Sequence, residues 1–184
     1  MSLPVTEVGR ELLHTRRVRY EGYKRADGLW DIEAHLTDIK NHDYQLKTGV
    51  RRAGQPVHSM WLRLTIDSKF NIVDAAASSE AVPYPGGCET IAPAYRSLVG
   101  LNLIRHFRAK SRELLGGVRG CTHLTEMLAG MPTAAIQSFA GEMKEERDDG
   151  SKPFQLDQCH ALETTGETVR RWYPKWHRKE TSTA

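Results

Sequence analysis

A cysteine and a histidine separated by one residue lie in the segment Gly120-Cys121-Thr122-His123-Leu124. Gly120 can take backbone conformations that other residues avoid, and Thr122 is a residue type that caps helix N-termini. We therefore expect Cys121 and His123 at a helix N-terminus, whose partial positive charge stabilises a thiolate or a carboxylate. The pair suits an activated thiol, an acid/base histidine or two metal ligands. The structural alternative is a small buried cysteine beside a histidine that caps local backbone.

A second cysteine, Cys88, follows the turn-rich stretch 83–87, which fixes its position. If the fold brings it to the segment above, Cys88, Cys121 and His123 offer three soft metal ligands. The late pair Cys159-His160 adds further ligand types. Neither CxxC nor CxxH spacing occurs, so the sequence contains no standard zinc finger or ribbon.

Two carboxylates, Asp31 and Glu33, alternate with apolar residues and share one strand face with His35. Carboxylates at this spacing can flank a substrate, and a neighbouring histidine can relay a proton. We list Asp31 and Glu33 with His123 and Cys121 as catalytic candidates. The alternative is an ordinary solvated sheet face.

Four further residues are candidates for substrate binding. Arg19 and Arg25 can bind a carboxylate through two parallel hydrogen bonds, and Tyr84 and Trp30 can line an aromatic pocket. The alternative for both arginines is surface solvation.

Four strands are expected. Alternating apolar residues predict strands over 29–38 and 57–67, the content of Arg, Val and Tyr predicts one over 15–25, and Ile72 and Val73 followed by small residues predict one over 71–79. The second strand places Trp30, Ile32, Ala34 and Leu36 on one face. Asp27-Gly28 is a hairpin turn, and the polar stretch 40–55 is expected to be a loop. An antiparallel up-and-down sheet of about four strands is the simplest arrangement.

After residue 87 the apolar period becomes helical. Helices are expected over 92–99, over 104–115 before Gly116-Gly117, from Thr122, and over 167–173. Pro132 interrupts the third helix or starts a new one. Strands followed by helices indicate an α+β fold with three or four helices packed on one face of the sheet.

The 184 residues include 39% hydrophobic and 27% charged residues and carry a net charge of +3, which fits one folded domain. We expect an ordered core over 12–177 with flexible termini. No transmembrane or secretory segment is seen, so we expect a cytoplasmic protein without a membrane partner. The charge excess is too small to indicate nucleic-acid binding. A homo-oligomer is left open.

Several motifs together resemble the bacterial family called domain of unknown function 2889. They are Arg25–Glu33, Ile72–Ala75, Tyr84-Pro85 with Cys88, Tyr95–Gly100, Gly116–Leu124, Cys159–Leu162 and Tyr173-Pro174. The resemblance spans residues 15–177 and implies a domain but little chemistry.

The order of strands, a cysteine-bearing loop, helices and a second cysteine is also similar to SufE/NifU-like scaffolds. That weaker likeness implies that Cys88 and Cys121 meet at one end of the sheet. It is a hint about fold, because the other scaffold ligands have no counterpart and His123 follows Cys121 instead of preceding it.

Our leading hypothesis is a small-molecule enzyme, a lyase that removes carbon dioxide or another one-carbon unit from an aromatic organic acid. No glycine-rich nucleotide cradle is present, so no organic cofactor is expected, while a metal ion is left open. The alternatives are a cysteine/histidine metal or iron-sulfur scaffold and a non-catalytic anion-binding module.

Overall fold

The computed structural model describes residues 3–140 and 150–179. The chain divides into two compact units, Met1–Ser138 and Phe139–Ala184. The organisation as one domain stays a prediction, and the expected flexible ends fall partly outside the described residues. No helix in the described residues is long and apolar enough to cross a membrane.

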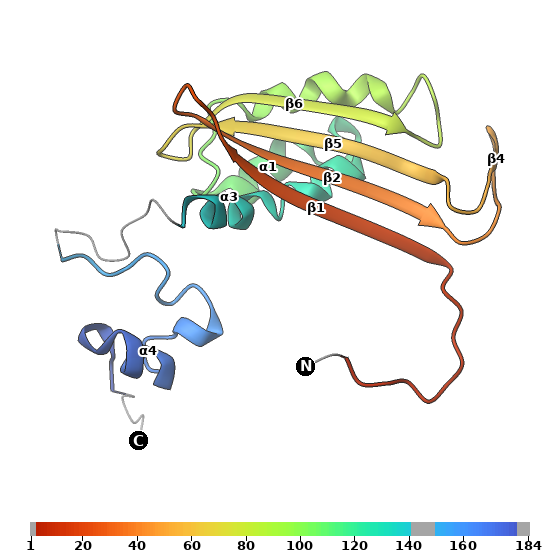
Figure 1. The fold of residues 1–184 in the computed structure, drawn as a ribbon. Helices are drawn as coiled ribbons and strands as arrows, with labels where there is room; N and C mark the ends of the chain where they lie inside the picture. The colour runs from red at the N-terminus through yellow and green to blue at the C-terminus, as the bar shows by residue number, and fades with distance from the viewer. Residues whose placement is uncertain (1–2, 141–149, 180–184) are drawn as a thin grey trace. The chain divides into compact units, whose positions relative to one another are not determined.

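The first unit is built on a four-stranded sheet in the order β1-β2-β5-β6 (Figure 1). Its strands are β1 (His14–Lys24), β2 (Trp30–Lys40), β5 (Pro56–Ile66) and β6 (Ile72–Ala81), and all neighbours are antiparallel. The predicted up-and-down sheet is therefore confirmed. Strands β2 and β5 coincide with alternating apolar residues and β6 with small residues, as expected for a sheet with one buried face.

The stretch expected to be a loop contains a short hairpin instead. Strands β3 (Tyr44–Leu46) and β4 (Gly49–Arg51) pair antiparallel as a separate two-stranded sheet. Three residues per strand are too few for an alternating pattern to stand out in a polar stretch. Gly49 has a φ of 128°, which a residue with a side chain rarely adopts.

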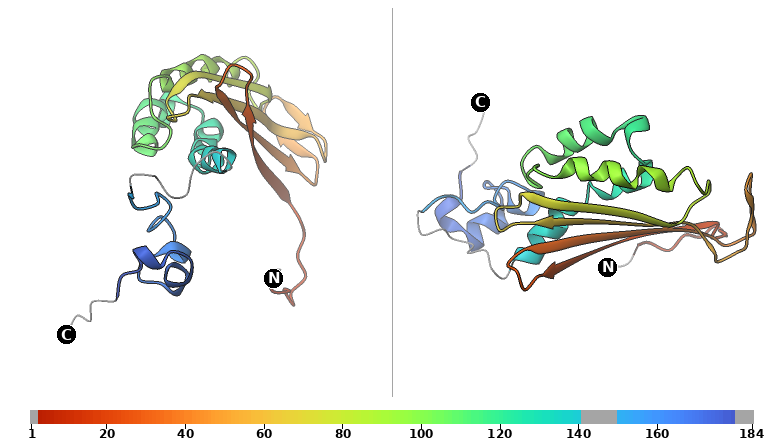
Figure 2. Two further views of the ribbon diagram at one scale, coloured as in Figure 1. Left: turned by 60° about the vertical axis from the view of Figure 1, so that its left-hand side comes forward. Right: turned by 90° about the horizontal axis from the view of Figure 1, so that it is seen from above.

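The helices of the first unit lie on one face of the sheet (Figures 1 and 2), so the predicted α+β arrangement is confirmed. They are the 3₁₀ helices η1 (Glu89–Leu98) and η2 (Gly117–Arg119) and the α-helices α1 (Phe107–Leu115), α2 (Thr122–Met127) and α3 (Met131–Phe139). In the second unit the described helices are η3 (His160–Leu162), α4 (Glu167–Trp172) and η4 (Pro174–Trp176).

Two helix boundaries differ from expectation. The helix expected from Ile104 begins at Phe107, because His106 takes a left-handed conformation with φ 56°. The first helix is 3₁₀ and contains Pro93, which lacks the N–H that an α-helix interior needs. Pro132 is the second residue of α3, so it starts a new helix.

The core lies between the helices and one face of the sheet. On β2, Ile32, Ala34 and Leu36 are fully buried on this face, and Trp30 is nearly so. Strand β5 adds Met60, Leu62, Leu64 and Ile66. The other face of β2 carries Asp31, Glu33 and His35, which are half-buried. The face assignment for β2 is therefore confirmed.

The junction between α2 and α3 packs directly on β1. A Cβ at Gly130 would lie 2.5 Å from the Tyr20 ring and hydroxyl. The ring cannot easily give way, because its hydroxyl donates a 2.9 Å hydrogen bond to the carbonyl of Met127. Glycine at this position therefore sets how closely the helices approach the sheet.

We predict that Gly130→Ala lowers the free energy of unfolding by about 1–3 kcal/mol, the usual cost of overpacking a tight contact. Gly9→Ala is the matched control, since a Cβ at Gly9 meets no atom within 4 Å. Urea unfolding of both variants measures the difference. Equal stabilities would contradict the close-packing interpretation.

Candidate active site

At one end of the sheet the buried face turns from apolar to charged. Asp38 follows Leu36 by two residues on β2, and His58 precedes Met60 by two residues on β5. The two are cross-strand partners, and Arg16 on β1 is the partner of Asp38 on its other side. Because strand residues two apart share a face, all three side chains point to the helix-covered side.

Asp38 is the centre of this cluster. Its Oδ1 accepts hydrogen bonds from His14 Nε2 at 2.9 Å and Arg16 Nε at 2.8 Å. Its Oδ2 accepts from Arg16 Nη2 at 2.8 Å and His58 Nδ1 at 3.0 Å. The Asp38 side chain is only 5% exposed, so four donors satisfy a carboxylate that water barely reaches.

These contacts decide the charge of Asp38. Burial alone would raise its pKa, but the hydrogen bonds and charge of Arg16, with the contacts from His14 and His58, outweigh burial and hold the pKa at about 2. Arg16 responds in the opposite sense: the hydrogen bond to Asp38 raises its pKa, so it stays cationic. At neutral pH the pair is therefore a carboxylate and a guanidinium.

His58 is held in one orientation by this carboxylate. Since Asp38 can only accept, His58 Nδ1 carries the proton of their hydrogen bond, and Nε2 keeps its lone pair. Burial lowers the pKa of His58, and the neighbouring His123 lowers it further, so the ring is neutral at pH 7. Within residues 3–140 and 150–179 no group hydrogen-bonds to His58 Nε2.

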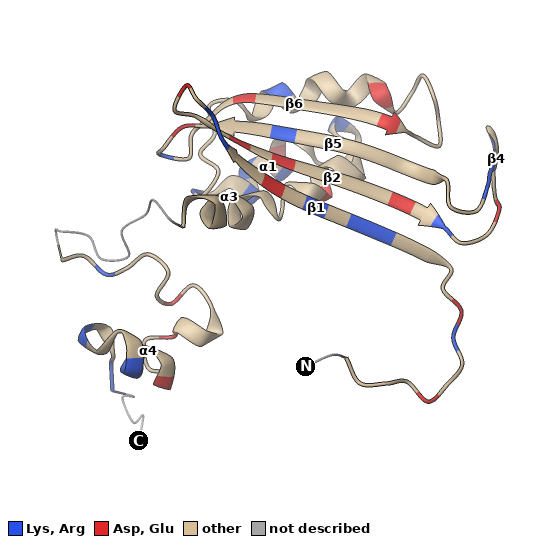
Figure 3. Cartoon of the chain, in the orientation of Figure 1, with Lys and Arg blue, Asp and Glu red and all other residues tan. Residues whose placement is uncertain are grey.

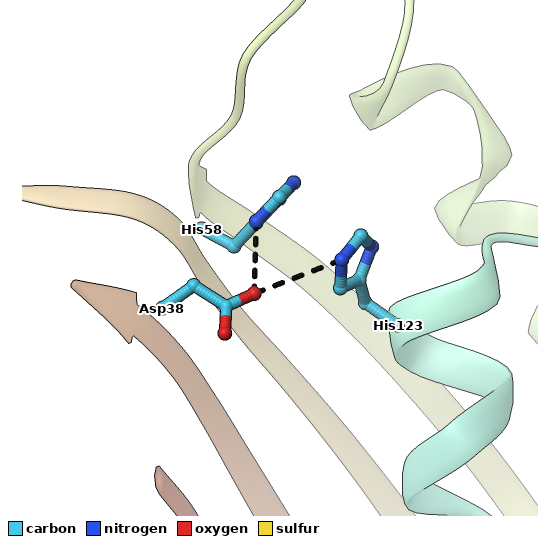
Figure 4. A group of neighbouring side chains, drawn as sticks. All are labelled: Asp38, His58 and His123. Atoms are coloured by element: carbon cyan, nitrogen blue, oxygen red, sulfur yellow. Dashed lines mark hydrogen bonds and ion pairs between the residues drawn. The ribbon is translucent and has the colours of Figure 1, made fainter. Parts of the chain in front are cut away.

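His123 reaches the same carboxylate from α2 (Figure 4). Its Nε2 lies 3.7 Å from Asp38 Oδ2, and its ring centroid lies 3.9 Å from that of His58. Burial lowers the pKa of His123, and the charge of Arg16 lowers it further. Two neutral imidazoles therefore lie side by side against one carboxylate.

The same arginine connects the helix to the sheet. Besides its two bonds to Asp38, Arg16 donates from Nη1 to the Glu126 carboxylate, which lies three residues after His123 on α2. One guanidinium thus joins β1, β2 and the helix that carries His123.

Two expectations about the segment before α2 are wrong. Cys121, not Thr122, is the N-cap residue of α2, and it makes no side-chain capping bond. Gly120 is in extended backbone that any residue adopts, with φ −147°. Glycine is needed at this position for lack of space, because a Cβ there would lie 2.3 Å from the Leu115 carbonyl oxygen.

A cavity of about 490 Å³ opens beside the two histidines. Its polar wall includes His58, His123, Cys121 and Cys88, and Tyr84 lies at its edge, 55% exposed. Met60, Pro83, Ile91 and Val118 supply apolar surface. The structure thus brings together four of the predicted site residues, namely Tyr84, Cys88, Cys121 and His123.

The other predicted site residues lie elsewhere. Asp31 and Glu33 occupy the sheet face opposite the helices of this unit, and Figure 3 marks residues of both charges along the strands. Arg25 binds Asp27 and Asp31 on the same side, and Arg19 lies over the Trp61 ring. Trp30 is a core residue, 7% exposed. None of these lines the cavity beside His123.

One group of potential metal ligands comes together in the described residues. It consists of Asp38, His58 and His123, whose ligand atoms lie within 4.8 Å of one another. It includes His123 of the predicted metal set but neither cysteine. The donor set fits a cation poorly, because Asp38 already accepts four hydrogen bonds and Arg16 places a positive charge against it. The arrangement suits proton transfer better.

The protein is therefore an α+β protein in which two histidines lie against one buried carboxylate. Both histidines line a cavity whose wall is partly polar and partly apolar. The chain belongs to the family described as protein of unknown function (DUF2889), whose model matches residues 14–137. That range contains every residue of the cluster and the cavity. No curated protein and no solved structure matches the chain, so the SufE/NifU-like fold stays a prediction.

Sequence reasoning missed Asp38, His58 and His14, and it considered Arg16 only as a substrate anchor like Arg19 and Arg25. A signal existed for two of them: continuing each apolar alternation by one step leads from Leu36 to Asp38 and from Met60 back to His58. A charged residue that continues a buried stripe is costly unless it is paired, which marks it as a candidate. Strand β1 has no apolar stripe, so His14 had no such signal.

We predict that Asp38→Asn lowers the free energy of unfolding at pH 7 by about 2 kcal/mol or more, following the lowered pKa of Asp38. The folded pKa is depressed, so the stabilisation is complete above the unfolded value and fades as pH falls through about 4 toward the folded value. Urea unfolding of wild type and variant at several pH values measures this.

The control is Asp74→Asn, whose carboxylate is 44% exposed and 3.6 Å from Arg96. An exposed pair of this kind contributes at most about 1 kcal/mol. If Asp38→Asn is no more destabilising than Asp74→Asn at pH 7, the central role of Asp38 in the fold is wrong.

Proposed function

We propose that this protein is a small-molecule lyase in which His58 acts as the general base. The observation that supports the proposal is the orientation of one ring: Nδ1 donates to a buried carboxylate while Nε2, without a partner in the described residues, keeps its lone pair on a residue that lines the cavity. A histidine fixed in this way by a carboxylate takes up protons at Nε2, and the carboxylate stabilises the imidazolium that forms.

The proposed step is loss of a one-carbon unit from a hydroxymethyl group. His58 removes the hydroxyl proton, the oxygen electron pair forms a carbonyl, and the carbon–carbon bond breaks. The carbon that keeps the electron pair then takes a proton from the His58 imidazolium, with His123 as the second proton carrier beside it. The products are the shortened compound and a one-carbon aldehyde, so the step is redox-neutral and needs no organic cofactor.

The lining of the cavity supports a neutral aromatic substrate over an acid. Among the described residues no lysine or arginine lines it, so a substrate carboxylate would lie there without a cationic partner from this part of the chain. Its apolar wall and the ring of Tyr84 suit an aromatic compound, and a volume of about 490 Å³ accommodates one or two rings. The predicted anchors Arg19 and Arg25 are on the other side of the sheet, which argues against the anion-binding alternative.

The test is a screen of hydroxymethyl-bearing and carboxyl-bearing aromatic compounds for release of a one-carbon aldehyde or carbon dioxide. We expect the hydroxymethyl class to react, and His58→Gln to lower kcat/KM at least ~100-fold, the usual contribution of a general base. The matched control is His42→Gln, which changes an exposed histidine outside the cavity. Undiminished turnover by His58→Gln would overturn the proposal.

The pH dependence follows from the lowered pKa of His58. A general base works in its unprotonated form, so we predict that kcat/KM rises with pH below 6.5 and is level at neutral pH. Asp38→Asn removes the carboxylate that stabilises the imidazolium, so it should shift this rise to lower pH and reduce the plateau. A profile that rises only above pH 7 would exclude His58 as the base.

A further inference from the structure

We propose that Cys121 is a second reactive group of the same cavity, a nucleophile that adds to aldehyde carbonyls with His123 as its base. This goes beyond the proposed lyase step, in which the thiol has no part. It stands on contacts that do not involve His58, so it can be right or wrong independently of that step.

Three groups lie in series, two in the cavity wall and the third, Asp38, buried behind His123. Cys121 Sγ lies 3.9 Å from His123 Nδ1, and His123 Nε2 lies 3.7 Å from Asp38 Oδ2. A nucleophile next to a base, with a third group that orients the base, is the arrangement that activates thiols and hydroxyls. The distances are those of a resting site, since such contacts tighten when a substrate binds.

The thiol is placed by main-chain contacts. The Tyr95 hydroxyl accepts a 3.1 Å hydrogen bond from the Cys121 N–H and also lies 3.1 Å from the Cys121 carbonyl oxygen. Tyr95 is fully buried, and its hydroxyl is 2.8 Å from Thr125 Oγ1 on α2. A side chain attached to backbone that is fixed on both sides is well positioned for chemistry.

The surroundings of the thiol suit a hydrophobic electrophile. Cys121 is half-buried, and its sulfur lies 4.0 Å from the sulfur of Met60, one of the apolar residues that line the cavity. Cys88 lines the same cavity, while Cys159 is exposed in the second unit. The reactivities of the three thiols can therefore be compared within one chain. Cys121 lies beside a histidine, Cys88 lies in the cavity without a histidine contact among the described residues, and Cys159 is exposed.

The step is an addition without oxidant or leaving group. Cys121 Sγ forms a bond to the carbonyl carbon as its proton passes to His123 Nδ1, and the carbonyl π bond opens onto oxygen. The proton then moves from His123 to that oxygen, which gives a neutral hemithioacetal. Because the addition is reversible, the thiol holds an aldehyde in the cavity without consuming it.

The first experiment measures alkylation of the folded full-length protein by iodoacetamide, with peptide mass spectrometry to separate the three cysteines. If exposure controlled reactivity, Cys159 would react first. We expect Cys121 to react about 10-fold faster than Cys159 at pH 7, because His123 lies beside the Cys121 thiol and can take its proton. A rate for Cys121 at or below that of Cys159 would overturn the proposal without any variant being made.

Two variants then separate this proposal from the lyase step. His123→Gln should slow alkylation of Cys121 about 10-fold and leave Cys159 unchanged, since it removes the base. His58→Gln should leave Cys121 alkylation unchanged, although it stops the lyase step. If His123→Gln, shown by urea unfolding to be folded, leaves Cys121 as reactive as before, His123 is not its base.

Benzaldehyde is the probe for the carbonyl. It should slow alkylation of Cys121 in a concentration-dependent way and leave Cys159 unaffected, whereas toluene at the same concentration should protect much less. Equal protection by toluene would show that the cavity binds the ring without bond formation, and would refute the addition step. Lyase turnover with no benzaldehyde protection would leave the proposed function standing and reject this one.

Discussion

The ion pair between Asp38 and Arg16 is the interaction on which the site depends. A carboxylate that is almost fully buried is costly unless donors surround it, and this one has four from three residues. The guanidinium contributes two of those donors and uses a third nitrogen to bind Glu126 on the helix that carries His123. The interaction that neutralises this buried charge therefore also positions α2 against the sheet.

The two histidines contact this carboxylate in different ways. His58 donates to it at hydrogen-bond distance, which fixes its tautomer, whereas His123 lies farther away and contacts the cysteine with its other nitrogen. Burial keeps both rings neutral at physiological pH. Two imidazoles that would repel each other as cations can thus lie side by side in one cavity wall.

The sequence predicted the sheet, its antiparallel order and the helices on one face, because alternation and turn residues are local signals. It also predicted His123, Cys121, Cys88 and Tyr84 as site residues, and the fold gathers them. Asp31, Glu33 and Arg19 were grouped with them although their strand positions belong to the opposite face. The site could not be predicted in full because it depends on long-range strand pairing. Asp38 and His58 become neighbours only through the register of β2 and β5, which no local pattern specifies.

The register of those two strands shifts immediately after the site. Asp38 is paired with His58, but Ile39 is paired with Pro56, so an irregularity separates the site from the β3–β4 hairpin that follows. A bulge absorbs an extra residue locally and leaves the pairing on its far side intact. The hairpin is thus separated from the pairing of Asp38 with His58, and its length can change in evolution or engineering without moving these two residues relative to each other. Because the Thr48 hydroxyl of this hairpin donates to the carbonyl of Pro83 in the cavity wall, such changes affect that part of the wall while Asp38 and His58 stay in place.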